Sequence, residues 1–589
     1  MDGSLQTTKD GSVDFKNRPA LKKKTGGWKA AVLVFGTELC ERLGAYGIGL
    51  NLVTYLINEL HISGSTVPNI VTNFLGTSYL CCLIGGFVAD AFLGRFLTIA
   101  IFSIIQFLGM SVLTISASLP SLRPPECSTV DPGSCRPAKG VELAMLYLAL
   151  YSMALGTGGI KSCVSAFGAD QFDEYDPDEK RHMSYYFNWF FVCITTGALV
   201  AVTLLVYVQD NIGRGIGYGL CAGSMLIAIS VFVAGIQSYR FKAPAGSPLT
   251  PILQVLVAAY YKRKLELPSD PNLLYEEPYG KRTVTGLSTK RLAHTKQFRF
   301  LDKAAIVEAD DYNESTICPW RLSTVTRVEE VKMLIRVLPI WASTFAFWTS
   351  YAQTATFTIE QATTLDRRLG KHFVMPPATA GVFIQASVII TVALYDRVFV
   401  PIVRRFTGNI QGITTLQRMG FGLLFSVLAM ITAALVERHR IAVVVAHNLL
   451  DKPKAIVPMS VFWLLPQYAI LGIGEVFAYI GQLEFFYKES PDGMRSIGTG
   501  LSLSTVSLGY FLSSFLVTTV DNVTKTKSQP GWLSNNLNRS KLYNFYWLLV
   551  VVSTLNWIIY LTFAHWYRYK AARSNSEVEA YQLANIETL

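Results

Sequence analysis

Three ionisable residues lie inside the first long apolar segment of this chain, in the stretch Phe35-Gly-Thr-Glu-Leu-Cys-Glu-Arg-Leu-Gly-Ala-Tyr46. Ionisable side chains at membrane depth are costly, and they usually line a path for ions or substrate. Glu38, Glu41 and Arg42 are spaced i, i+3, i+4, so a helix presents them on one face. Two carboxylates and one guanidinium leave one negative charge unbalanced, so the cluster can bind and release a proton. The stretch therefore predicts a protein that moves a substrate across a membrane and uses protons to do so.

The rest of the sequence has the composition of a membrane protein. Of 589 residues, 51% are hydrophobic and 16% are charged, below the roughly 25% of charged residues in soluble domains. About twelve runs approach the ~20 apolar residues that span a bilayer as a helix. These runs begin near Trp28, Ile70, Phe96, Val141, Tyr185, Ile216, Val331, Ala378, Thr414, Pro458, Ser496 and Tyr543. The sequence predicts an all-α membrane protein with twelve transmembrane helices in two six-helix halves.

The spans and the polar stretches between them divide the chain into five parts. We expect a cytosolic N-terminal tail, a six-helix bundle, a cytosolic central loop, a second six-helix bundle and a cytosolic C-terminal tail, over residues 1–27, 28–236, 237–330, 331–567 and 568–589. Within the central loop, Ile252–Leu265 mixes apolar residues with a basic end, which is typical of an amphipathic helix on a membrane surface. Basic residues gather on the side assigned to the cytosol, although Arg438 and Arg440 fall on the other side.

Charge and cysteine content argue against two other kinds of site. The net charge is +11, but the basic clusters flank apolar spans, which disfavours a nucleic-acid-binding protein. The nine cysteines include no Cys-x-x-Cys pair, and no His cluster accompanies them. We therefore expect no bound metal and no cofactor.

Two loops assigned to the outside carry possible sites of covalent modification. Cys127 and Cys135 lie in the polar loop after the third span, where they either form a disulfide or remain thiols. The sequons Asn522-Val-Thr and Asn538-Arg-Ser lie in a later outside loop, and we expect N-glycosylation there.

The two halves contain a similar segment after their second helix. The second span is followed by Gly85-Gly-Phe-Val-Ala-Asp-Ala-Phe-Leu-Gly-Arg95, and the eighth by Tyr395-Asp-Arg-Val-Phe-Val-Pro-Ile-Val-Arg-Arg405. Each segment places an aspartate at a helix end with arginine beyond it. Transporters built from repeats show this kind of internal symmetry, although a membrane helix can also end in Asp and Arg without a repeat.

Several motifs together resemble the proton-coupled oligopeptide transporter family, whose plant branch is the nitrate transporter/peptide transporter family. Glu38-x-x-Glu41-Arg42 is similar to the ExxER motif of this family. Gly86-x-x-x-Asp90-x-x-x-Gly94-Arg95 resembles the loop motif of the wider major facilitator superfamily. Two further segments resemble family signatures: Phe486-Tyr-Lys-Glu-Ser-Pro-Asp-Gly-Met-Arg-Ser496 and Leu301-Asp-Lys-Ala-Ala-Ile306.

The resemblance runs from Thr25 to Tyr569 and carries expectations for the fold and the mechanism. It implies the major facilitator fold, both termini in the cytosol, a central cavity and alternating access. It also implies that Asp90, Gly94 and Arg95 take part in the conformational change.

A lysine in the first half and a glutamate in the second lie deep within apolar spans. They are Lys161, in Gly156-Thr-Gly-Gly-Ile-Lys161, and Glu475, in Gly472-Ile-Gly-Glu475-Val-Phe. A buried lysine without a partner tends to lose its proton and a buried glutamate to gain one, so pairing them across the cavity resolves both problems. The family has a lysine and a glutamate at these spans, and the resemblance implies a salt-bridge gate. The alternative is a static pair that only joins the halves.

The resemblance also suggests which residues contact the substrate. Tyr351 stands where the best-known plant nitrate transporter of the family has a histidine, which weakens a nitrate assignment. Tyr46 and Tyr79 match tyrosines of peptide-carrying members, whereas Ala45 interrupts the paired tyrosines of those members. For these tyrosines, ordinary helix packing is the alternative. We expect the substrate near the midplane, against Arg42, Tyr46, Tyr79, Lys161, Tyr351, Gln353 and Glu475.

Thr98 follows Arg95 by three residues at the start of the third span. A nitrate-carrying member of the family has a regulatory phosphorylated threonine in the same Arg-x-x-Thr context. A phosphate there would add about two negative charges beside Arg95 and loosen the local packing. We expect either a protein kinase that acts on Thr98 or an unmodified threonine at a helix start.

These observations predict a plant-type proton-coupled symporter. No His-Glu-x-x-His, Gly-x-Ser-x-Gly or paired-Asp motif lies within a span, so we do not expect an enzyme. Its partners are protons, the lipid bilayer and a small-molecule substrate. Low-affinity nitrate uptake is the first choice; the alternatives are di- or tripeptides, and organic anions such as plant hormones or specialised metabolites. A nitrate sensor with little transport is a further alternative, and we expect the plasma membrane rather than the vacuolar membrane.

Overall fold

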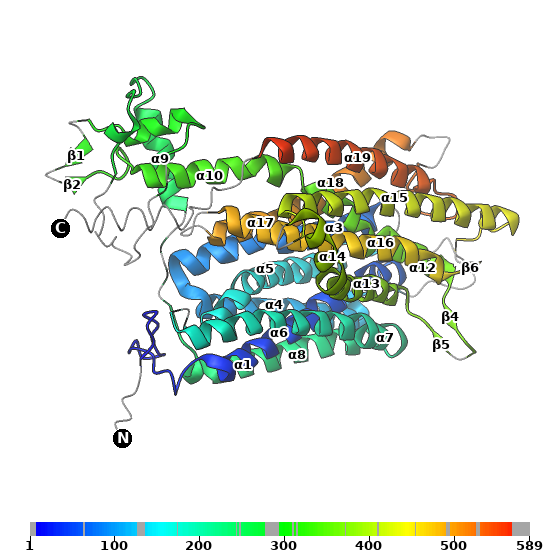
Figure 1. Ribbon diagram of the computed structural model, residues 1–589. Helices are drawn as coiled ribbons and strands as arrows, with labels where there is room; N and C mark the ends of the chain where they lie inside the picture. Colours follow the sequence, from blue (N-terminus) through cyan, green and yellow to red (C-terminus); the bar gives the residue numbers. More distant parts are fainter. Residues whose placement is uncertain are drawn as a thin grey trace.

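The computed structural model is a bundle of long helices that run side by side, with loops and short elements at both ends (Figure 1). It describes residues 7–62, 65–125, 136–173, 175–242, 244, 246, 249–276, 292, 294–308, 311–313, 316–371, 373–408, 412–453, 455–490, 495–525 and 531–567.

Ten helical segments of the described chain are long and apolar enough to cross a membrane. One of them, Thr66–Ser118, contains two successive spans, α3 and α4. The first span, α1, is not among the ten because it carries several charged residues. Counting α1 and dividing Thr66–Ser118 gives the twelve predicted spans.

Each half contributes six spans, several of which are built from consecutive shorter helices. The N-terminal half contains α1 (Gly27–Gly49), the short α2 (Leu52–Asn58), α3 (Thr66–Val88), α4 (Gly94–Ser118), α5 (Val141–Ala169), α6 (Pro177–Val200) with α7 (Val206–Asn211), and α8 (Arg214–Ala234). The C-terminal half contains α10 (Val325–Ala342) with α11 (Phe345–Tyr351) and α12 (Phe357–Thr364), α13 (Val382–Leu394) with α14 (Val400–Thr407), α15 (Thr415–Ala446), α16 (Leu465–Glu475) with α17 (Gly481–Glu489), α18 (Arg495–Thr524) and α19 (Leu542–Trp566).

The breaks within spans are mostly π-helical turns, which are rare and frequently lie at functional sites. Within spans they are η4 (Ala201–Leu205), η11 (Tyr395–Phe399) and η13 (Val476–Ile480), and a fourth, η1 (Ala89–Leu93), links the spans α3 and α4. Short 3₁₀ turns connect other elements: η2 (Pro120–Leu122), η5 (Gly235–Ser238), η6 (Pro271–Leu273), η7 (Arg299–Ala305), η9 (Ala352–Ala355), η10 (Pro377–Gly381) and η12 (Val461–Leu464).

The strands are very short and pair only in the loops. Strand β1 (Tyr312–Asn313) is antiparallel to β2 (Thr316–Ile317), and β4 (Arg368–Leu369) is antiparallel to β5 (Phe373–Val374). Strand β3 (Leu365–Asp366) runs parallel to β6 (Val457–Ser460).

Helix α6 begins at Pro177, eight residues before the predicted start of this span near Tyr185. The Asp176 carboxylate accepts a hydrogen bond from the backbone N–H of Asp178 (3.0 Å), and a proline at the first helical position needs no N–H partner. The first turn is polar, so a count of apolar residues does not detect it.

The two halves pack along α3 and α18, and hydrogen bonds join them near one end. The Ser65 hydroxyl donates to Asp521 (2.9 Å), and the Asn69 amide donates to the Thr518 hydroxyl (2.9 Å). Tyr207 of the first half stacks on Phe373 of the second, with ring centroids 6.0 Å apart. All these residues lie in the parts of the chain assigned to the outside, so the outer ends of the halves are in contact.

A related ion pair recurs in the two halves. Arg95, at the start of α4, pairs with Asp170, directly after α5. Arg418, at the start of α15, lies 3.9 Å from Glu484 of α17. In both halves the third span begins with an arginine that faces an acid at the end of the fourth. This agreement supports the internal repeat proposed from the sequence.

The central loop contains a small folded region, which we call the central body: α9 (Leu249–Tyr261), η7 and the start of α10 (Figure 1). Its core contains Val255 and Ala258 of α9, Leu301 of η7 and Val328 of α10. The amphipathic helix α9 therefore begins three residues before its predicted start at Ile252. The seventh span begins with α10 at Val325, inside the stretch 237–330 that was predicted as a loop.

A buried lysine fixes the central body to α10. The Lys332 ammonium is fully buried and bonds to Asp302 (2.6 Å), Glu329 (2.7 Å) and the carbonyl of Thr295 (3.0 Å). His294, Asp302 and Glu329 bring metal-type ligand atoms within 4.8 Å of one another. Because the Lys332 ammonium pairs with both carboxylates and the Arg336 guanidinium lies 4.0 Å from Glu329, we assign no metal to this cluster.

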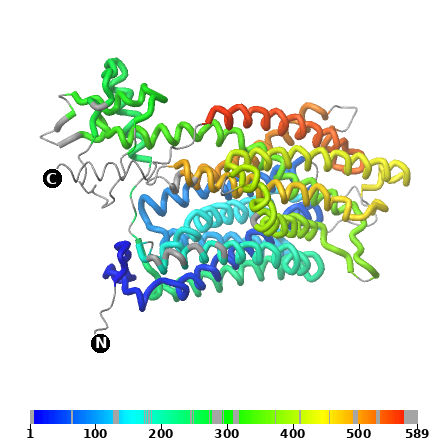
Figure 2. Tube along the Cα trace, in the orientation of Figure 1, coloured from blue at the N-terminus to red at the C-terminus, as the bar shows by residue number. Residues whose placement is uncertain are grey.

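The N-terminal strap (residues 7–26) folds back on the same end of the bundle as the central body (Figures 1 and 2). Val13 pairs with Pro19 and with Phe241 beyond α8, and Lys22 pairs with Asp176. Hydrogen bonding to Lys22 lowers the pKa of Asp176 below its ordinary 3.8, and hydrogen bonding to Asp176 raises the pKa of Lys22 above 10.5. The pair is therefore present above the lowered carboxyl pKa and is lost as pH falls through it or rises through the raised ammonium pKa.

Lys22→Met is expected to loosen the strap at neutral pH. The substitution removes the ammonium group that pairs with Asp176 and Asp173, so amide hydrogen exchange in residues 8–20 should accelerate. Lys24→Met is the matched control, because Lys24 is exposed. Equal exchange rates in the two variants would contradict the role given to Lys22.

Candidate functional site

The ionisable cluster of α1 is buried and lies on one helical face. The Nε atom of Arg42 is 2.6 Å from Oε1 of Glu38 and 3.5 Å from Oε2 of Glu41. Glu38 is 1% exposed and Glu41 is 0% exposed. Neither oxygen of Glu41 has a hydrogen-bond partner among the described residues. Among the described residues, Glu41 is thus a buried carboxyl group whose ion-pair partner is a guanidinium shared with a second carboxylate.

Small residues on the neighbouring helices make room for this cluster. A Cβ atom at Gly197 of α6 would lie 2.8 Å from the Cβ of Arg42, so only glycine allows α6 to approach α1 so closely. Gly44 meets Met110 of α4 in the same way. The backbone of α1 is therefore held near two other helices at the depth of the charges.

Lys161 lies on α5, just after a group of glycines that let three helices meet. A Cβ atom at Gly158 would collide with Cys81 of α3, and one at Gly159 with Phe102 of α4. This close packing places the Lys161 ammonium over the ring of Tyr79, 4.8 Å from its centroid. The face of an aromatic ring attracts a lysine ammonium, so this contact stabilises the positive charge in part even without a carboxylate partner.

Glu475 is the last residue of α16, and the π-helical turn η13 follows it directly. Tyr351 hydrogen-bonds to its carboxyl group, and Oε2 is buried without a hydrogen-bond partner among the described residues. Lys161 and Glu475 are both described, and no ion pair within 4.0 Å joins them. The predicted pair is thus apart in this conformation, each member resting on a tyrosine.

Several tyrosines surround the charged residues. Electrostatic interactions link Tyr46 to Arg42, Lys161 and Glu475. Tyr79 stacks on Tyr510 of α18, with centroids 6.4 Å apart, which brings the halves together beside Lys161. One group at the interface of the halves therefore contains six of the predicted residues: Arg42, Tyr46, Tyr79, Lys161, Tyr351 and Glu475.

Two members of this group, Tyr479 and Tyr510, were not predicted. Tyr479 lies in η13 and packs on Trp348 (5.7 Å between centroids), and it interacts electrostatically with Arg42 and Glu475. The sequence carried a usable signal, since Tyr479 follows Glu475 by four residues and a helix brings such residues to one face. Tyr510 follows Gly509, which packs on Trp348.

Gln353, predicted to contact the substrate, packs inside the second half instead. It is 1% exposed, and its amide nitrogen donates to the carbonyl of Thr349 (2.9 Å) and the hydroxyl of Ser513 (3.0 Å). These bonds join η9 to α18, so the side chain holds two spans together in this conformation.

The loop motif and Thr98 lie at the end of the first half that the sequence assigns to the cytosol. Gly94 has a φ of +75°, a left-handed conformation that favours glycine. Thr98 is 0% exposed, and its hydroxyl donates to the carbonyl of Gly94 (2.9 Å). A kinase therefore needs the start of α4 to open before it can reach this hydroxyl.

The expectation of a glycan on Asn538 is wrong for the folded protein. Asn538 is 1% exposed; its amide nitrogen donates to the carbonyls of Leu449 and Lys452 (both 3.1 Å), and its oxygen accepts from Arg440 (2.9 Å). Asn522 is exposed on the last turn of α18 and stays a predicted site. Cys127 and Cys135 lie outside the described residues.

The sequence and the fold of this chain are similar to those of known proteins. A family model described as PTR2, POT family, matches residues 96–533. The Arabidopsis thaliana proteins NRT1/PTR FAMILY 6.3 and 6.2 are 49% and 48% identical to this chain, covering 97% of both chains and 96% of both chains respectively. The solved structure of an auto-inhibited POT family peptide transporter has a TM-score of 0.67 at 20% identity, covering 93% of this chain and 98% of that chain.

Proposed function

Since the chain belongs to the POT family of transporters, we propose that it is a proton-coupled symporter that takes up nitrate with low affinity by alternating access. The family and the fold are those of transporters and not of enzymes, and the protein is an integral multi-pass membrane protein. We further propose that it works in the plasma membrane.

The observation that carries proton coupling is the state of Glu41. Its carboxyl group is 0% exposed and lacks a hydrogen-bond partner among the described residues, while Arg42 is shared with Glu38. Ionisable groups at membrane depth are rare and usually line a path for ions or substrate, and we propose that this carboxyl group carries the proton. Release requires a change in surroundings, and alternating access supplies one.

Contacts between the outer ends of the halves suggest how the cycle uses Lys161 and Glu475. The bonds of Ser65 and Asn69 to α18 favour a conformation closed to the outside. We propose that Lys161 and Glu475 separate in this conformation, and that they pair when the inner end closes and the outer end opens.

Tyr351 provides a test of the substrate. An anion would be held by Arg42 or Lys161, with the Tyr351 hydroxyl as a hydrogen-bond donor. Tyr351→Phe is expected to lower nitrate uptake about 10- to 100-fold, as loss of a hydrogen bond to a charged group costs about 1.5–3 kcal/mol. Tyr147→Phe, on the exposed side of α5, is the control. Currents in oocytes over a substrate panel, with the external pH stepped, measure the effects of both substitutions on uptake.

The tyrosine-rich surroundings favour organic substrates as a second candidate. Tyr46, Tyr79, Tyr351, Tyr479 and Tyr510 offer aromatic faces and hydroxyl groups, which suit a peptide or an organic anion better than a small inorganic one. Uptake of dipeptides or a plant hormone, with no nitrate current at any pH, would overturn the nitrate assignment and leave the symporter standing.

Regulation through Thr98 is part of the proposal. A kinase would act when the inner end of the first half opens, and the added charge beside Arg95 would keep α4 from repacking. A nitrate sensor with little transport would show this regulation without substrate flux, so flux measurements separate it from a symporter.

A further inference from the structure

A buried ion pair closes the outer end of the second half. Arg440 and Glu437 of α15 are 1% and 0% exposed and form two bonds, of 2.8 and 2.7 Å. The remaining N–H groups of the guanidinium reach Asn538 (2.9 Å), the carbonyl of Leu537 (2.9 Å) and Thr364 (3.4 Å). This pair is electrically neutral, and every N–H of the arginine has an acceptor.

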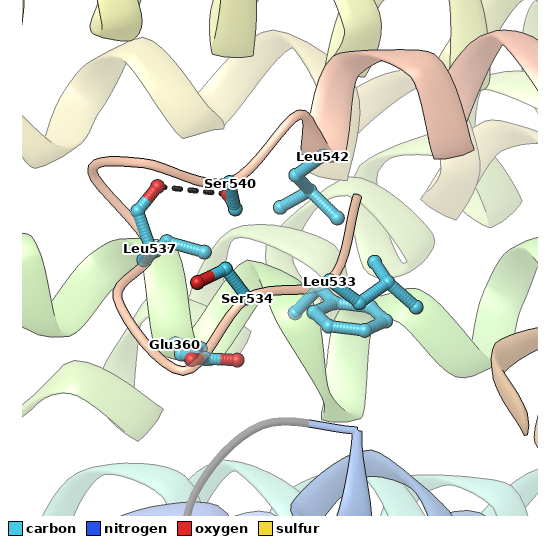
Figure 3. Close-up of a pocket in the computed structure, with 7 residues that line it drawn as sticks. Glu360, Leu533, Ser534, Leu537, Ser540 and Leu542 are labelled. Carbon is cyan, nitrogen blue, oxygen red and sulfur yellow. Dashed lines mark hydrogen bonds between the residues drawn. The ribbon is translucent and has the colours of Figure 1, made fainter. Parts of the chain in front are cut away.

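Glu360 of α12 lies beside this pair without a cation of its own. It interacts electrostatically with Arg440 and Glu437, yet no ion pair within 4.0 Å joins it to a cation in the described parts of the chain. Its carboxyl group borders a cavity of about 10 Å³, room for about one water molecule. The cavity is lined by Phe357, Glu360, Leu533, Ser534, Leu537, Ser540 and Leu542 (Figure 3).

The other titratable or charged groups around α12 are already engaged or face elsewhere. Tyr546 of α19 donates to Gln361 (3.1 Å), and Tyr468 of α16 donates to the carbonyl of Thr354 (3.3 Å). Asp366 of β3 pairs with Arg368 (2.9 Å), and Arg539 of the 531–541 loop pairs with Asp451 (2.5 Å). Tyr55 of α2 packs on Tyr218, and Lys541 is exposed.

Two carboxylates and one guanidinium again leave one negative charge unbalanced, as in the α1 cluster. Glu437 already pairs with this cation, and burial in a partly apolar cavity makes an ionised Glu360 costly. A neutral carboxylic acid avoids that cost and can donate a hydrogen bond to the hydroxyl or carbonyl groups of the cavity wall.

We propose that Glu360 is a second proton-binding residue, which takes its proton from the outside solution. Glu360 is partly exposed at the outer end, whereas Glu41 is fully buried. Glu360 lies nine residues beyond Tyr351 on the same span, roughly 14 Å away at about 1.5 Å per residue. Proton binding there acts on the span whose Tyr351 holds Glu475. This inference deepens the proposed function, because it concerns the entry of the driving proton.

The consequence for the cycle is a dependence of outer closure on external pH. Protonated Glu360 allows α12 and the loop of residues 531–541 to pack as they do here. Ionised Glu360 favours their separation. An acidic exterior therefore favours the closed outer end, the conformation in which substrate has been taken from outside.

Glu360→Gln tests this proposal, because glutamine imitates the protonated acid at every pH. External acid stimulates uptake by the symporter, and we expect this stimulation to be at least about twofold smaller in the variant than in the wild type. Glu59→Gln is the matched control: Glu59 is another outer carboxylate, but it pairs with Arg123 at 3.0 Å. Unchanged pH profiles in both variants would overturn the proposal.

A second measurement does not depend on transport. The purified wild-type protein should gain thermal stability as the pH falls from neutral to mildly acidic. The Glu360→Gln protein should be more stable than the wild type at neutral pH. It should also gain less thermal stability than the wild type when the pH is lowered. Identical pH dependence of melting in the two proteins would overturn the role of Glu360. A wild-type protein that carries no tested substrate would contradict the proposed function, while the melting comparison still decides the protonation of Glu360.

Discussion

Glu41→Gln is expected to abolish proton-driven accumulation of substrate while the protein folds and reaches the membrane at its normal level. Glutamine fills the same space but cannot bind and release a proton. The Glu41 oxygens have no hydrogen-bond partner among the described residues, so the replacement breaks no bond between helices. Loss of a positioned proton-transfer group typically costs about 10²–10⁴-fold in rate, and we expect initial uptake rates to fall within this range.

The measurement is uptake into proteoliposomes with and without an inward proton gradient. Glu41→Gln should still exchange substrate across the membrane when no gradient is imposed, because exchange does not require proton release. Glu41→Asp is the matched variant and should keep part of the coupled rate. A well-expressed Glu41→Gln protein that concentrates substrate like the wild type would refute the assignment of Glu41.

Lys161→Ala and Glu475→Ala are each expected to stop turnover. In the conformation described here each residue rests on a tyrosine, Lys161 over Tyr79 and Glu475 on Tyr351. In the opposite conformation each needs the other, and removing one partner of a buried pair costs about 3–5 kcal/mol. That cost corresponds to a loss of roughly 10²-fold or more in the population of the paired state.

The double variant distinguishes this gate from two unrelated defects. If the residues pair, Lys161→Ala with Glu475→Ala should be no slower than either single variant, because the second substitution removes a charge that is already unpaired. Multiplicative losses in turnover would show that the two residues act separately. Tyr510→Phe, which keeps the ring that stacks on Tyr79, serves as the control for general disturbance of the interface.

The fold and the family were predictable from local patterns, and both predictions are confirmed. Long apolar runs determine membrane spans almost by themselves, because the bilayer leaves few alternatives to a helix. The i, i+3, i+4 spacing placed Glu38, Glu41 and Arg42 on one face without knowledge of any other helix. The motif beginning at Gly86 and the ExxER motif indicated the family for the same reason, since each is contained in one short segment.

Features that depend on distant segments were not predictable in this way. The sequon at Asn538 has the correct three residues, but Arg440, almost a hundred positions earlier, occupies its amide oxygen. Gln353 has a polar side chain in an apolar span, and only its position against Ser513 shows that it joins helices. The separation of Lys161 from Glu475 depends on which ends of the halves are in contact, which no local pattern contains.

Labels on the strap and on the central body would report how the two halves move relative to each other. The strap is held on the first half through the pairs of Lys22 with Asp176 and of Val13 with Phe241, and the central body is held on the second through Lys332. Both lie at the same end of the bundle (Figure 2). A fluorophore at Asn17, on the exposed turn of the strap, would move with the first half. A fluorophore at Phe300, exposed on η7, would move with the second half. Energy transfer between them would follow single molecules through the transport cycle without a label inside the membrane.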